Sequence, residues 1–113
     1  MINENDQNYL KIQFYLAEIT KKLMDIFKTK WLKVNKYDWG NEKRKKLLIK
    51  ELYINLVKNQ KKSIESKDIQ EWDISLYYTI FNYSNMLYQK ELSNGIYQIK
   101  KVRNDFAHNL ISN

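Results

Sequence analysis

The candidate chemistry of this chain lies near its C-terminal end, in the segment KKVRNDFAHN at residues 100–109. This segment contains His108, the only histidine in the sequence, and Arg103 stands five positions before it. Histidine has a reference pKa of about 6.5 and can therefore move a proton near neutral pH. The pair is a candidate site for phosphodiester cleavage. The same pattern is also typical of the polar side of a helix, where a histidine near the C-terminus interacts with the helix dipole.

In a helix, Asn104 and His108 would face the same side, whereas Arg103 would point in another direction. Asn104 precedes His108 by four positions, so in a helix the two residues share a side and can act on one ligand. The five-residue step from Arg103 to His108 corresponds to roughly 140° of rotation and about 7.5 Å of rise. Arg103 then reaches the same ligand only through its long side chain or from a neighbouring copy. The spacing therefore favours a site built from two chains.

The elements that must carry this segment are helices. The chain of 113 residues has no proline and only two glycines, so helices meet few interruptions. Apolar residues recur every three or four positions in four segments, at about residues 6–33, 43–57, 74–88 and 96–110. With 43% apolar residues, the chain has enough hydrophobic content for one compact core. We predict an all-α fold, a single-domain antiparallel four-helix bundle over residues 1–113.

Local signals mark the ends of these helices. Trp39-Gly40 fits a turn, and Ser93 to Gly95 fits a second turn before the last helix. Asp73 is expected to cap the third helix, with Trp72 packing on Tyr77 as a hydrophobic staple. The polar segment at residues 58–70 predicts a loop of about a dozen residues.

The helical period also predicts which side chains are buried. The expected buried positions are Tyr9, Ile12, Leu16, Ala17, Ile19, Leu23, Met24, Ile26, Phe27 and Trp31 in the first helix, Leu48, Ile49, Leu52, Tyr53, Leu56 and Val57 in the second, Leu76, Ile80, Tyr83 and Leu87 in the third, and Ile96, Ile99, Val102, Phe106 and Leu110 in the last. We assign the three tryptophans, Trp31, Trp39 and Trp72, to packing. Five further aromatic residues are either core and interface or stacking platforms for unpaired bases: Tyr77, Tyr78, Phe81, Tyr83 and Tyr88.

The charge of the chain favours an acidic partner. Lys and Arg outnumber Asp and Glu by 20 to 13, and the formal net charge of +7 predicts attraction to phosphates or to an acidic surface. The candidate RNA-binding residues are Lys43, Arg44, Lys45, Lys46, Lys100 and Lys101, although a run of charges is also typical of a solvated helix face.

Other classes of protein are disfavoured. The chain has no cysteine and one histidine, so we expect no metal site and no cofactor. The longest uncharged stretch, residues 74–89, is shorter than the roughly 20 apolar residues of a membrane span. The N-terminus is acidic and rich in amides, unlike a signal peptide. We expect an intracellular protein, cytoplasmic or nuclear, without membrane association.

The segment IYQIKKVRNDFAHN resembles the signature of HEPN domains, small helical domains of RNA-targeting toxins, CRISPR effectors and antiviral proteins. In that motif an arginine, usually followed by a polar residue, precedes a histidine by four to six positions. The segment KDIQEWDISLYYTIFNY is also similar to the region before the motif in one HEPN subfamily, that of an RNA-binding RING-type ubiquitin ligase of animals. The resemblance covers about residues 72–109. One departure is that Ser93 to Gly95 leaves a shorter loop before the motif.

The resemblance implies a metal-independent endoribonuclease that leaves 2′,3′-cyclic phosphate and 5′-OH ends. His108 would assist attack by the ribose 2′-OH or protonate the leaving 5′-oxygen. Arg103 would bind the phosphate and stabilise charge in the transition state, and Asn104 would orient the phosphate or the imidazole. Two copies would face each other through the motif helices as a homodimer. The alternative is a catalytically silent HEPN-like RNA-binding, dimerisation or scaffold subunit of a larger protein complex.

Overall fold

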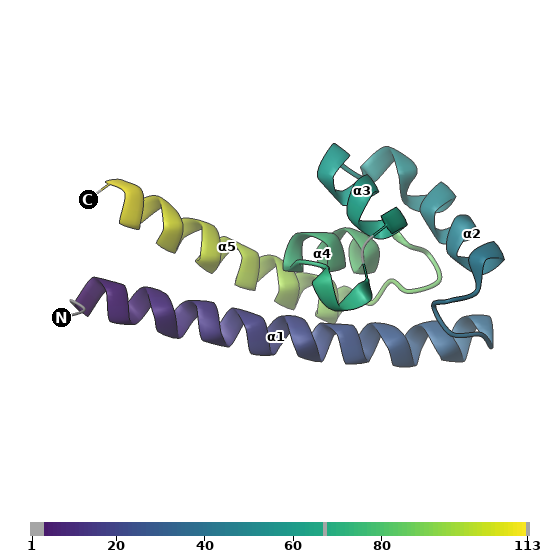
Figure 1. Cartoon of the computed structure of the whole chain (residues 1–113), viewed down its shortest axis with the longest axis horizontal. Helices are drawn as coiled ribbons and strands as arrows, with labels where there is room; N and C mark the ends of the chain where they lie inside the picture. The colour runs from purple at the N-terminus through teal and green to yellow at the C-terminus, as the bar shows by residue number, and fades with distance from the viewer. Residues whose placement is uncertain (1–3, 67, 113) are drawn as a thin grey trace.

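The structure is a computed structural model that describes residues 4–66 and 68–112, with side chains described for residues 6–66 and 68–105. Every regular element within these residues is helical (Figure 1). The α-helices are α1 (Glu4–Asn35), α2 (Glu42–Leu52), α3 (Lys58–Ser66), α4 (Ile74–Tyr83) and α5 (Lys90–Ser112), and the short 3-10 helices are η1 (Tyr53–Asn55) and η2 (Ile69–Glu71). The predicted all-α class is confirmed, with five α-helices in the described residues instead of four.

The helices form an elongated body measuring 50 × 28 × 24 Å. Helix α1 runs along the whole length of the molecule, and α5 returns antiparallel to its N-terminal half, so α1 begins and α5 ends at the same end (Figure 1). Helix α4 packs against both α1 and α5, while α2 and α3 lie at the other end. No helix in the described part of the chain combines the length and the apolar content that crossing a membrane requires.

The ends of α1 and α2 follow from local hydrogen bonding. Lys36 adopts a left-handed backbone conformation with φ of 66° and donates its N–H to the carbonyl of Leu32 at 2.9 Å, which ends α1. The N–H of Gly40 donates to Oδ1 of Asp38 at 2.9 Å, so the predicted Trp39-Gly40 turn is confirmed. Asn41 then caps α2 by accepting the N–H of Arg44 at 3.1 Å.

The prediction of a long loop at residues 58–70 is wrong, because α3 and η2 occupy most of this segment. Ile64, one of the few apolar residues in the segment, is fully buried in the core. Nε1 of Trp72 donates to the carbonyl of Ser63 at 3.0 Å and ties the helix to the start of α4. Two buried side chains, Ile64 and Ile69, and hydrogen bonds such as that from Trp72 therefore order a segment whose average composition is that of a loop.

The prediction of a turn at Ser93 to Gly95 is also wrong, because these residues lie inside α5. The chain turns earlier, at residues 85–87, where the N–H of Asn85 donates to Oε1 of Glu51 at 2.9 Å. Ser93 is buried, and its hydroxyl donates to Oδ1 of Asn82 at 2.7 Å. Contact with α4 therefore holds the sequence Ser-Asn-Gly in a helix.

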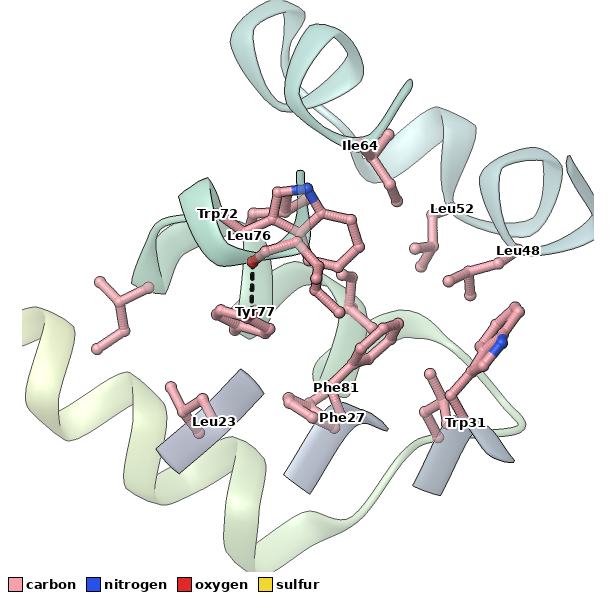
Figure 2. Packing of buried hydrophobic residues seen from close by; sticks show 14 of the residues in the cluster. Leu23, Phe27, Trp31, Leu48, Leu52, Ile64, Trp72, Leu76, Tyr77 and Phe81 are labelled. Atoms are coloured by element: carbon pink, nitrogen blue, oxygen red, sulfur yellow. Dashed lines mark hydrogen bonds between the residues drawn. The ribbon is translucent and has the colours of Figure 1, made fainter. Parts of the chain in front are cut away.

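The core is built around an aromatic cluster (Figure 2). Phe27 of α1 lies at its centre, with ring centroids between 5.3 and 6.4 Å from those of five partners: Trp31, Trp39, Trp72, Tyr77 and Phe81. Apolar side chains of α2 and α3 close the cluster from the other side, namely Leu48, Leu52 and Ile64. The assignment of the tryptophans to packing is confirmed.

The start of α4 agrees with its sequence signals. Oδ1 of Asp73 accepts the N–H of Leu76 at 2.9 Å, which confirms the predicted cap. The rings of Trp72 and Tyr77 lie 5.7 Å apart, which confirms the predicted staple. Other burial predictions are wrong, because six of the expected core residues are exposed: Tyr9, Ala17, Tyr53, Val57, Tyr83 and Val102. Tyr53 and Val57 lie beyond the end of α2, where the helical period no longer holds.

Candidate functional site

The three motif residues lie on one continuous helix. Arg103, Asn104 and His108 all belong to α5, so the predicted helical spacing of their backbone positions is confirmed. The side chain of His108 lies outside the described side chains, which end at Asp105 on α5. The geometry of the site is therefore described from Arg103 and Asn104.

The side chain of Arg103 is half-buried and turned toward the start of α4. Its Nη2 donates to Oγ of Ser75 at 3.4 Å and to Oδ1 of Asn104 at 3.1 Å, and its Nε donates to the same Asn104 oxygen at 3.3 Å. Oδ1 of Asn104 thus accepts two N–H groups of the Arg103 guanidinium and orients it. The sequence did not indicate Ser75 or the role of Asn104 toward Arg103.

Arg103 lies at the border of two open cavities. The larger cavity, about 680 Å³, lies between α1, η2, α4 and α5 and is lined by polar groups that include Gln13, Lys21 and Gln70. The second cavity, about 300 Å³, has an apolar lining between α1 and α5 that includes Leu16 and Ile99. A guanidinium and an ammonium that share one cleft with amide side chains can bind an anion such as a phosphate. The larger cavity is therefore the candidate anion site.

Asn104 faces a third cavity on the other side of Arg103. This cavity, about 230 Å³, is lined by Tyr78 of α4 and by five residues of α5: Tyr97, Lys100, Lys101, Asn104 and Asp105. Two of the predicted RNA-binding lysines, Lys100 and Lys101, are thus neighbours of a motif residue. Tyr97 was not singled out from the sequence, because its position is set by its contact with α4, which the helical period does not reveal.

The surroundings of Lys100 reduce its basicity. Its ammonium lies 4.6 Å from the centroid of the Tyr78 ring. Partial burial and the nearby positive charge of Arg103 lower the pKa of Lys100, whereas Asp73 acts in the opposite direction. Burial, followed by the neighbouring Tyr83 and Tyr97, raises the pKa of Tyr78. Three cations, Lys100, Lys101 and Arg103, thus lie around the motif, with the carboxylates of Asp73 and Asp105 near Lys100.

The basic run of α2 lies far from the motif. Helix α2 is at the opposite end of the molecule from the C-terminal half of α5 (Figure 1). Arg44 lies over the ring of Tyr37 at 5.9 Å and Lys45 lies over the ring of Trp39 at 5.2 Å, whereas Lys43 and Lys46 are exposed. The structure thus brings Lys100 and Lys101, but not the four basic residues of α2, to the motif.

The five aromatic residues considered as stacking platforms have different environments. Tyr77 and Phe81 are buried in the core, which leaves no free ring face for a base. Tyr78 is half-buried beside Tyr97, and Tyr83 and Tyr88 are exposed. Of these five residues, Tyr78 lines the cavity that Asn104 also lines.

Among the residues that the structure describes, no group of three or more His, Cys, Asp or Glu side chains is arranged to hold a metal ion. Comparisons with models of protein families, with curated proteins and with solved structures found no match to this chain. The class that the observations define is an all-α, basic protein with a cleft of mixed polar and apolar lining at an Arg-Asn motif.

Proposed function

We propose that this chain is a HEPN-like, metal-independent endoribonuclease. The observation that carries the proposal is the position of Arg103, a half-buried residue that lines a cavity of about 680 Å³ together with Lys21 and lies on the helix that also contains Asn104 and His108. The net charge of +7 supports attraction of a polyanionic substrate. Lys21 in the cleft supports phosphate binding there.

The proposed reaction is transesterification within the RNA strand. His108 assists attack of the ribose 2′-oxygen on the adjacent phosphorus or protonates the leaving 5′-oxygen. The new 2′-O–P bond replaces the 5′-O–P bond, which leaves a 2′,3′-cyclic phosphate and a free 5′-OH. Arg103 stabilises the charge that develops on the phosphoryl oxygens through its N–H donors. Asn104, already hydrogen-bonded to Arg103, keeps the guanidinium oriented.

The proposed active form is a homodimer. Helix α1 exposes large apolar side chains near its N-terminal end, including Leu10, Phe14 and Tyr15, and Tyr15 lines the apolar cavity together with the exposed Val102 of α5. Exposed apolar side chains that gather at one end of a molecule are typical of an interaction site. Pairing of two copies through this surface would bury it and supply each motif helix with a partner helix.

The test is cleavage of single-stranded RNA in the presence of EDTA. The wild-type chain is expected to cleave RNA but not DNA, since DNA lacks the 2′-OH, and to leave the cyclic phosphate and 5′-OH ends. His108→Ala is expected to lower the rate by about 10²- to 10⁴-fold, the usual effect of removing a positioned acid or base. Arg103→Ala should also be severe, and Asn104→Ala intermediate.

The control is Lys62→Ala, at an exposed basic residue of α3, which should cleave RNA at nearly the wild-type rate. Circular dichroism of each variant checks that its helices are retained. Absence of cleavage by the wild type, or full activity of His108→Ala, would remove the nuclease proposal.

The exposed apolar surface of α1 also favours a second function. A catalytically silent RNA-binding or dimerisation subunit of a larger complex would use the same surface without any chemistry at His108. The hydrogen bonds of Arg103 to Ser75 and Asn104 are consistent with a structural role of this arginine. A dimeric wild type that binds RNA without cleaving it would favour this second function.

A further inference from the structure

A pair of tyrosines lies at the surface next to the motif. Tyr78 of α4 and Tyr97 of α5 have ring centroids 6.1 Å apart and an interplanar angle of 45°. Tyr97 is 50% exposed, so a large part of its side chain remains in contact with solvent. Exposed tyrosine rings are used by RNA-binding proteins to stack on bases that are not paired.

Cations and a polar amide surround this pair. Lys100, Lys101 and Asn104 line the same cavity of about 230 Å³ as the two tyrosines. Tyr97, Lys101 and Asn104 are separated by four and three residues, so they form one row along α5. The row continues the motif toward the N-terminal end of the helix. Arg103 follows Tyr97 by six residues, which corresponds to about 9 Å along the helix axis and roughly 120° around it, so a strand with a phosphate at Arg103 places a neighbouring nucleotide near Tyr97 by crossing the Asn104 side of α5.

The size of the cavity restricts what can enter it. Pockets for drug-sized ligands have volumes of about 300–1,000 Å³, so a cavity of about 230 Å³ suits a smaller group such as a single base. A base within a duplex is already stacked and paired, and its face is not available to a side chain. Two lysines and one carboxylate, that of Asp105, line the cavity, so its net positive charge favours a negatively charged backbone beside the base over a neutral ligand.

We propose that Tyr97 and Tyr78, with Lys101 and Asn104, form a subsite that stacks one unpaired base of an RNA strand next to the scissile phosphate. The subsite rests on the proposed ribonuclease function and specifies its substrate class as single-stranded RNA. Tyr97 supplies the exposed ring face, and Lys101 contacts the backbone. Lys100 lies over Tyr78 and holds that ring in place. Tyr97 is a binding residue, and the chemistry remains at the motif.

The test is a comparison of binding and cleavage with three variants. Tyr97→Leu removes the ring, Tyr97→Phe retains it, and Tyr88→Leu changes a tyrosine of closely similar exposure, 52%, outside the subsite. Binding is measured by fluorescence anisotropy with a short single-stranded oligonucleotide whose 2′-hydroxyls are methylated, so that it cannot be cleaved. The same oligonucleotide in a duplex is the second probe. Cleavage is measured with unmodified single-stranded RNA.

We expect Tyr97→Leu to weaken binding of the single strand by at least roughly five-fold, the lower end of the effect of one lost stacking contact. Tyr97→Phe and Tyr88→Leu should bind like the wild type, and the duplex should bind more weakly and show no dependence on residue 97. Because the lost contact positions the substrate, Tyr97→Leu should also raise KM in the cleavage assay more than it lowers kcat.

The outcomes separate the subsite from the nuclease proposal. Cleavage by the wild type with unchanged binding by Tyr97→Leu would overturn the subsite alone. Binding that depends on the Tyr97 ring, without cleavage by the wild type, would support the subsite and remove the nuclease. Equal weakening by Tyr88→Leu, preferential binding of the duplex, or no binding of the single strand would also overturn the subsite.

Discussion

Replacement of Gly95 by alanine distinguishes the helix of the structure from the turn that the sequence favours. Gly95 is the sixth residue of α5, and its φ is not positive. A methyl group at this position would have no neighbouring atom within 4 Å, apart from the local helix backbone and adjacent residues. The substitution therefore adds neither a clash nor a new packing contact, and its effect should come from backbone entropy alone.

The magnitude follows from helix propensity. Glycine is about 0.8–1.0 kcal/mol less favourable than alanine in a helix interior. Gly95→Ala should therefore raise the free energy of unfolding by about that amount. For a chain of this size the corresponding increase in Tm is roughly 3–6 °C. If residues 93–95 formed a turn that requires glycine, the same substitution would instead lower the stability.

The assay is thermal and urea unfolding followed by circular dichroism, with Gly40→Ala as the matched control. A Cβ at Gly40 would lie 3.1 Å from Oδ1 of Asp38, which is closer than most contacts of a Cβ atom. Gly40 also lies in a turn and not in a helix, so alanine gains no helix propensity there. We therefore expect Gly40→Ala to be neutral or destabilising. A lower Tm for Gly95→Ala than for the wild type would refute the helical assignment and the stability argument together.

Three further predictions concern hydrogen bonding, assembly and charge. Within the described residues the buried hydroxyl of Ser84 has no hydrogen-bond partner, so Ser84→Ala should change stability by less than about 0.5 kcal/mol. Ser93→Ala removes the 2.7 Å hydrogen bond to Asn82 and should cost about 1–2 kcal/mol in the same unfolding assay. The wild type should be a dimer in light scattering. Phe14→Glu should yield a folded monomer, because this residue, which is 63% exposed, belongs to the proposed dimer surface. If the Phe14→Glu variant is still a dimer, the interface lies elsewhere. RNA binding should weaken steeply as salt is raised, with a linear log–log dependence, whereas binding that is insensitive to salt would contradict a contact through phosphates.

Much of the helical framework could be predicted from the sequence. The period of apolar residues located α1, α2 and α4 because each buries one side, and Asp73 identified the start of α4 because its carboxylate satisfies a free backbone N–H. The helical state of the Arg-Asn motif was predicted for the same reason. These features depend on short-range chemistry, which is fully encoded in neighbouring residues.

Other parts of the fold required contacts between distant residues. Helix α3 has too little apolar content to be distinguished from a loop, and the burial of Ile64 against α2 and α4 orders it. Ser93 and Gly95 have the composition of a turn, but the hydrogen bond from Ser93 to Asn82 retains them in α5. In both cases tertiary packing outweighs a local preference of about 1 kcal/mol or less per residue.

The residues of the candidate chemistry can be identified from the sequence: a single histidine, an arginine five positions before it, and an excess of cations. The surroundings of that arginine depend on how the helices pack. The packing of α4 against α5 places Ser75 beside Arg103 and pairs Tyr78 with Tyr97, and it leaves the basic run of α2 at the other end of the molecule. The chemical type of a side chain is set by its own residue. Its neighbours in space are set by how helices that are distant in the sequence bury their apolar faces against each other.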